Sequence, residues 1–135
     1  MAFKFEKLDV WERALNYADR AEALTSERPS KERFNLADQL RRAATSIALN
    51  IAEGSIGQSD AEQSPFLGYA QRSLVETVAC LHLIHRRRYV DASVLREAYV
   101  EAETLFRQLP AFRRSLGGTG SVREDAADYE LPPPF

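Results

Sequence analysis

Cysteine is nearly absent from the sequence, and so are other features that would point to particular classes of protein. Cys80 is the only cysteine, which excludes an intrachain disulfide and is compatible with a reducing compartment. The longest stretch without a charged side chain is Ala43–Ala52, about half of what a membrane span needs. The N-terminus carries charges where a signal peptide would have its apolar core. These absences predict a soluble, cytoplasmic protein with no membrane partner.

A strong charge of one sign is also missing. The formal net charge is -2 over 135 residues, and 44% of the positions are hydrophobic, which suits a single compact domain. The charge is uneven, because the tail from residue 117 holds four acidic residues and one arginine. Neither part is charged strongly enough to require a polyanionic partner.

Glycine and proline are scarce, with six of each, and they fall between or near the ends of four apolar stripes of helical period. The stripes predict helices over 9–25, from 31 or 35 to 53, from about 60 to 88, and from about 92 to 116. Pro65 leaves two possibilities for the start of the third helix: either the helix begins earlier and kinks at Pro65, or Ser64–Pro65 is its true beginning. No segment alternates with period two for long enough to form a strand.

Four long helices with short links predict an all-α fold, an antiparallel up-down-up-down four-helix bundle with a short N-terminal lead-in. The bundle domain should span residues 1–116. The tail, residues 117–135, is glycine-rich, then acidic, then proline-rich, and is expected to be flexible or to dock on a neighbouring subunit. Its natural anchors are Tyr129, Leu131 and Phe135.

The most patterned stretch is QLRRAATSIALNIAEGS, residues 39–55. Around it, apolar residues recur at spacings of three and four and should form one face of the second helix: Leu36, Leu40, Ala43, Ala44, Ile47 and Ile51. Asn50 lies beside this stripe. A ligand contact is one role for its amide, but a polar core contact with Ser46, Ser73 or Glu76 is favoured, since a buried amide needs a partner.

Arg41 and Arg42 point about 100° apart on a helix, so at most one of them can lie along the edge of the apolar stripe. The favoured interpretation is that Arg42 pairs with Glu76 or Glu53 across helices, while Arg41 meets a neighbouring subunit or a phosphate. The alternative is that both arginines are solvated. The predicted structural polar core is therefore Arg42, Asn50, Glu53 and Glu76.

The strongest basic run is Arg86, Arg87 and Arg88, at the end of the third helix. Favourable placement at the negative end of a helix dipole accounts for it. The alternative is contact with nucleic-acid phosphates, shared with Arg41. Aromatic side chains are not regularly interleaved with these charges, so the nucleic-acid signal is weak.

Catalytic patterns are poor. His82 and His85 could share a helical face, but no third metal ligand is evident. Cys80 has no base beside it and suits a core position. The glycines after residue 116 follow a helix and lack a P-loop lysine. We therefore expect no catalytic, cofactor-binding or metal-binding residues, no cofactor and no enzymatic activity.

Two stretches carry a family resemblance: QLRRAATSIALNIAEGS, and FLGYAQRSLVETVACLHL after a short serine-containing loop. With the opening FEKLDVWERA, they resemble the four-helix-bundle proteins encoded in intervening sequences of large-subunit ribosomal RNA genes. That family in turn resembles the accessory protein of diversity-generating retroelements, a ring-shaped homopentamer that binds nucleic acid and a reverse transcriptase. The resemblance covers about residues 3–116 and implies a bundle that forms a ring, with no established reaction.

The sequence thus predicts a non-enzymatic assembly protein whose partner is itself, as a pentamer by resemblance. The alternative is an accessory factor that binds RNA or DNA through clustered arginines. Several apolar residues stand off or at the edge of their stripes and are candidates for the interface between subunits: Tyr17, Leu24, Leu83, Tyr99 and Val100.

Overall fold

The computed structural model describes residues 2–26, 31–56, 60–117 and 132–135, and every regular element in these ranges is helical. Their side chains are described for 2–26, 35–56, 65–112 and 132–135. A short 3-10 helix, η1 (Lys4–Lys7), precedes the α-helices. These are α1 (Asp9–Thr25), α2 (Lys31–Glu53), α3 (Asp60–Arg86) and α4 (Ala92–Gly117).

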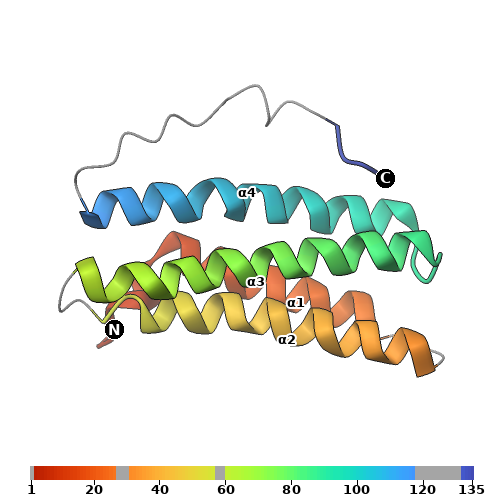
Figure 1. The fold of residues 1–135 in the computed structure, drawn as a ribbon, viewed down its shortest axis with the longest axis horizontal. Helices are drawn as coiled ribbons and strands as arrows, with labels where there is room; N and C mark the ends of the chain where they lie inside the picture. Colours follow the sequence, from red (N-terminus) through yellow and green to blue (C-terminus); the bar gives the residue numbers. More distant parts are fainter. Residues whose placement is uncertain (1, 27–30, 57–59, 118–131) are drawn as a thin grey trace.

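The four α-helices lie side by side along the long axis of the molecule (Figure 1). Helix α1 packs against α2 and α4, and α3 packs against the same two helices, so each helix has its chain neighbours beside it. Short links between consecutive helices force them to run antiparallel. This arrangement confirms the predicted all-α four-helix bundle. No helix in the described part of the chain carries an apolar stretch long enough to cross a membrane.

The predicted stripe of α2 forms the centre of the core. All six of its members are buried, and Ala44, Ile47 and Ile51 are completely inaccessible to solvent. Fully burying an isoleucine or leucine side chain contributes about 1.5–3 kcal/mol, so this face is a principal source of stability. The stripe therefore specifies how α2 packs on its neighbours.

The buried stripe of α1 includes two residues that the sequence assigned to the interface between subunits. Its apolar members are spaced by four and three residues: Val10, Ala14, Tyr17, Ala21 and Leu24. Trp11, Leu15 and Ala18 are only partly buried at its edge. The prediction of Tyr17 and Leu24 as interface residues is therefore wrong, because both lie inside the bundle, where they are 1% and 7% exposed.

The helix boundaries follow the sequence closely, and two alternatives that the sequence left open are resolved. Helix α2 begins at Lys31, the earlier of the two predicted starts. Helix α3 begins at Asp60, and Pro65 lies inside it, so a beginning at Ser64–Pro65 is wrong. Pro110 likewise lies inside α4, which continues to Gly117.

The turn between α3 and α4 places an arginine in a conformation that usually requires glycine. Arg88 has a positive φ of 57°. Its N–H donates to the carbonyl of His85 at 3.0 Å, and the N–H of Tyr89 donates to the carbonyl of Ile84 at 3.2 Å. This pair of bonds is the Schellman motif, which satisfies the last carbonyls of a helix. The backbone thus explains where the basic run Arg86–Arg88 lies: at the end of α3 and in the turn.

Candidate interaction surface

The asparagine of α2 makes the contact that the sequence predicted. The side-chain amide of Asn50 donates to the carbonyl of Ser46 at 2.9 Å and lies 3.0 Å from its hydroxyl oxygen. That hydroxyl forms a further hydrogen bond of 2.8 Å with the hydroxyl of Ser73 on α3. The chain Asn50–Ser46–Ser73 therefore links α2 to α3 with neutral polar groups at the edge of the core.

The ion pair across helices that the sequence predicted for Arg42 is made by Arg41 instead. The side chain of Arg42 is 81% exposed and pairs with Asp38 on its own helix at 3.2 Å. Arg41 is 28% exposed and lies 3.8 Å from Glu22 of α1, near Asp38 at 4.0 Å. The assignment of Arg42 to the polar core is therefore wrong, because its helical position directs it to solvent.

The two glutamates proposed as partners of Arg42 do not lie in the core either. Glu53 and Glu76 are both exposed. Their assignment to the structural polar core is wrong, since an exposed carboxylate keeps its hydration and gains nothing from a buried partner. Of the four predicted members, only Asn50 makes the expected polar contact.

A buried polar contact that the sequence did not reveal joins α1 to α3. The hydroxyl of Tyr17 donates to the hydroxyl oxygen of Thr77 at 2.8 Å, and Thr77 donates to the carbonyl of Leu74 at 2.6 Å. Desolvation raises the pKa of Tyr17 to about 12, although its hydrogen bond to Thr77 acts in the opposite direction. The spacing from Ala14 to Tyr17 to Ala21 was the available signal that the ring points inward.

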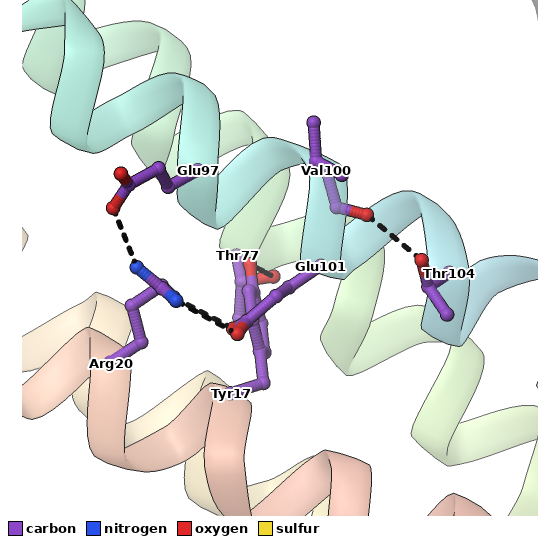
Figure 2. Close-up of polar contacts among 7 residues, drawn as sticks. All are labelled: Tyr17, Arg20, Thr77, Glu97, Val100, Glu101 and Thr104. Carbon is purple, nitrogen blue, oxygen red and sulfur yellow. Dashed lines mark hydrogen bonds and ion pairs between the residues drawn. The ribbon is translucent and has the colours of Figure 1, made fainter.

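A second contact missed by the sequence joins α1 to α4 (Figure 2). Arg20 donates from one guanidinium nitrogen to Glu97 and from another to Glu101, each at 3.0 Å. Its Nε lies 2.9 Å from Oε2 of Glu101, in an ion pair too bent for a hydrogen bond. The hydrogen bond to Glu101 is the main cause that raises the pKa of Arg20 above its usual value. One arginine therefore fastens two successive turns of α4 to α1.

The basic run at the end of α3 borders an open hollow. Arg86, Arg87 and Arg88 are all exposed. The hollow has a volume of about 1140 Å³, and its polar lining combines both histidines with arginines and one carboxylate: Arg20, His82, His85, Arg86, Arg88 and Asp91. Arg41 does not line it. The structure thus brings Arg86 and Arg88 to one site and leaves Arg41 elsewhere, beside the carboxylates of Glu22 and Asp38.

An apolar groove runs between α3 and α4, and we call it the α3–α4 groove. Its central hollow measures about 450 Å³ and has a mainly aliphatic and aromatic lining: Leu74, Val75, Val78, Ala79, His82, Tyr99, Ala102, Glu103 and Phe106. Val75 and Phe106 also line an adjoining hollow with Pro65 and Tyr69. Val75 is 57% exposed and Phe106 47% exposed, so both of these apolar side chains face solvent.

Of the remaining predicted interface residues, Tyr99 lines this groove, and Leu83 and Val100 are exposed on the same two helices. Leu83 on α3 is 40% exposed, and Val100 on α4 is 49% exposed. Tyr99 is half-buried and lines the groove, where desolvation raises the pKa of its hydroxyl. These three positions are therefore accessible to a partner, as an interface role requires.

The C-terminal residue of the chain packs against one end of the α3–α4 groove. The ring of Phe135 lies 5.2 Å from that of His82, 4.9 Å from that of His85 and 5.7 Å from that of Tyr99, measured between centroids. Of the other predicted tail anchors, Tyr129 and Leu131 lie outside the described residues. The contact made by Phe135 is with its own chain, whereas the sequence suggested a neighbouring subunit.

The cysteine of α3 lies inside the bundle. Cys80 is buried, and burial, together with the nearby charge of Glu76, raises the pKa of its thiol. A raised pKa keeps the sulfur protonated and weakly nucleophilic. Among the described side chains, no three histidine, cysteine, aspartate or glutamate residues are grouped so that they could hold a metal ion.

Comparisons with known proteins identify the family. The family model of the 23S rRNA-intervening sequence protein matches residues 6–111. A crystal structure of a protein of unknown function from the S23 ribosomal protein family of Bacteroides thetaiotaomicron has the same fold, with a TM-score of 0.71. It is 24% identical in sequence, and the match covers 78% of this chain and 98% of that one.

The search of curated proteins finds no significant match. The further resemblance to the accessory protein of diversity-generating retroelements is not tested by these comparisons and stays a prediction. The family match spans α1, α2, α3 and most of α4, the elements that build the bundle and its surfaces. This chain belongs to the 23S rRNA-intervening sequence protein family.

Proposed function

We propose that the chain is a non-enzymatic assembly protein that associates with copies of itself through the α3–α4 groove. The observation that carries the proposal is the pair Val75 and Phe106, which are about half exposed and line two adjoining hollows. Large contiguous apolar patches are uncommon on monomeric proteins and mark contact sites. The groove is thus a surface on which a second copy would bury apolar side chains.

A second apolar site lies on a different helix. Leu49 on α2 is 58% exposed, and Ile56, just after the end of α2, is 69% exposed. Two unlike patches on one subunit favour a head-to-tail contact, which closes into a ring or grows into a fibre. A ring is the closed outcome, and five subunits is the number implied by the resemblance to related bundles.

The test is light scattering of the gel-filtered protein at micromolar concentration, with a charge placed in the groove. Val75→Glu should lower the association constant more than about 100-fold, because assembly would bury an unpaired carboxylate. Its free energy of unfolding should change little, since Val75 is already exposed. Asn16→Glu, at an exposed position of α1, adds the same charge away from the groove and should assemble normally. A monomeric wild-type protein would refute the proposal.

A second candidate function is binding of nucleic-acid phosphates at the basic hollow. The observation that favours it is the convergence of Arg86, Arg88, His82 and His85 on one open site beside the half-buried ring of Tyr89. A flexible arginine cluster can neutralise phosphates, and each neutralised phosphate adds to the salt dependence of binding. Asp91 in the same lining reduces the positive potential.

A salt series decides this second candidate. Binding of a mixed-sequence RNA should weaken steeply with salt, and Arg86→Gln should reduce the slope of log K against log salt by about one. Arg13→Gln, on the exposed surface of α1, is the matched control and should leave the slope unchanged. Binding that is absent, or that is insensitive to salt, would exclude the candidate.

A further inference from the structure

The last four residues lie against the bundle in an alternating manner. Pro133 and Phe135 are half-buried, whereas Pro132 and Pro134 are exposed. The ring of Phe135 sits among His82 and His85 of α3 and Tyr99 of α4, with centroids 4.9–5.7 Å away. The plane of the Phe135 ring is inclined at 72° to the ring of His82 and at 79° to the ring of Tyr99, so both pairs are edge to face. This is the favoured geometry of aromatic pairs.

The chemistry of the segment suits such a site. Proline has a fixed φ and no N–H, so three successive prolines lose little entropy on docking and leave no backbone donor unsatisfied. Proline-rich segments are recognised by grooves with aromatic linings for this reason. The wall formed by His82, His85 and Tyr99 supplies flat rings of that kind.

The docked ring lies at the surface that association would use. His82 and Tyr99 contact Phe135, and the same two residues line the central hollow with Val75 and Phe106. We propose that residues 132–135 form an intramolecular cap, which occupies one end of the α3–α4 groove and competes there with a second copy of the chain. The inference rests on the proposed function, since a cap matters only if the groove is an interface.

The length of the tail allows this contact within one chain. From Tyr99 to Gly117, α4 rises about 27 Å. The residues from 118 to 135 can span up to about 60 Å when extended, which is ample for a return along α4. A tethered segment has an effective concentration near the millimolar range, so a second copy must bind well to displace it.

Docking can be measured without reference to assembly. The chain has only two histidines, and both contact Phe135, so their ring-proton NMR signals report on the cap directly. In the wild-type protein these signals should be displaced by the ring current of Phe135. Phe135→Ala should remove the displacement, and the control Pro134→Ala, at an exposed position, should keep it. Signals that are identical in the wild type and Phe135→Ala would overturn the proposal.

Assembly is then compared by light scattering over a dilution series. Phe135→Ala should increase the association constant by roughly tenfold, while Pro134→Ala should match the wild type. If both the wild type and Phe135→Ala assemble with equal constants, the cap is refuted and the proposed function stands. If Phe135→Ala assembles less well, the segment bridges subunits and the cap is again refuted. If neither protein associates at any concentration, the proposed function itself fails.

Discussion

Helix α4 meets its two neighbours through surfaces of opposite character. On the side of α1, Arg20 reaches Glu97 and Glu101, and the amide of Gln108 donates to Asp9 at 3.2 Å. On the side of α3, the surface is an apolar groove with an open central hollow. Between α1 and α4, polar and charged side chains bind one another within the same chain, and we call this contact the closed seam. The contact between α3 and α4 leaves apolar surface exposed to solvent. A partner is therefore expected to bind on the α3–α4 side of the bundle.

The largest expected effect concerns Tyr17, which lies beneath the closed seam. Its pKa is about 12 in the folded protein against 10.0 for the free side chain, because burial disfavours the phenolate. The raised pKa means that the stabilisation is complete below pH 10 and is lost as the pH rises towards 12. The loss should reach about 2–3 kcal/mol.

Urea unfolding of the wild type and Tyr17→Phe across this pH range measures that loss. The variant should be less stable by about 1 kcal/mol at neutral pH, because Thr77 loses a hydrogen-bond partner. At high pH the free energy of unfolding of the variant should then decrease less steeply than that of the wild type. Parallel curves would show that the ring is not shielded as the structure indicates.

The next effect tests the closed seam itself. Arg20→Leu should lower the free energy of unfolding by about 2 kcal/mol, since it removes two charge-assisted bonds that are only partly screened by solvent. Arg13→Leu is the control, because Arg13 pairs with Asp9 on its own helix and is half exposed. That variant should lose no more than about 0.5 kcal/mol. Equal losses of stability in the two variants would show that the Arg20 contacts do not hold α1 and α4 together more strongly than an ordinary surface ion pair.

The smallest effect concerns the turn that joins α3 to α4 at the end of the open side. Arg88→Gly should raise the free energy of unfolding by about 0.5 kcal/mol, because relief of the positive φ exceeds the added entropy of the unfolded chain. Arg86→Gly, at the last residue of α3, should instead destabilise the protein by up to about 1 kcal/mol. Thermal unfolding of the two variants decides the matter: a loss in both would show that the turn holds no strain.

The candidate surfaces were only partly foreseeable. The contact of Asn50 with Ser46 followed from a helical spacing of four residues, and the exposure of Leu83 and Val100 followed from their position off the stripe. The partners of Arg20 lie on α4, far along the chain, and no local pattern connects them. The ion pair across helices was assigned to Arg42 and not to Arg41 because a step of 100° shows only that the two side chains diverge, without indicating which one faces a neighbouring helix.

By itself the sequence determined the helices, most of their ends and the core face of α2, because these depend on short-range periodicity and on breaks in it. The family resemblance was also readable in the sequence, and the match over residues 6–111 confirms it. Only the tertiary structure decided which side of α4 is closed by charge and which is left apolar. It also placed Phe135 beside His82, His85 and Tyr99. Such contacts join residues far apart in the chain, and their geometry depends on how the helices rotate against one another when the core packs.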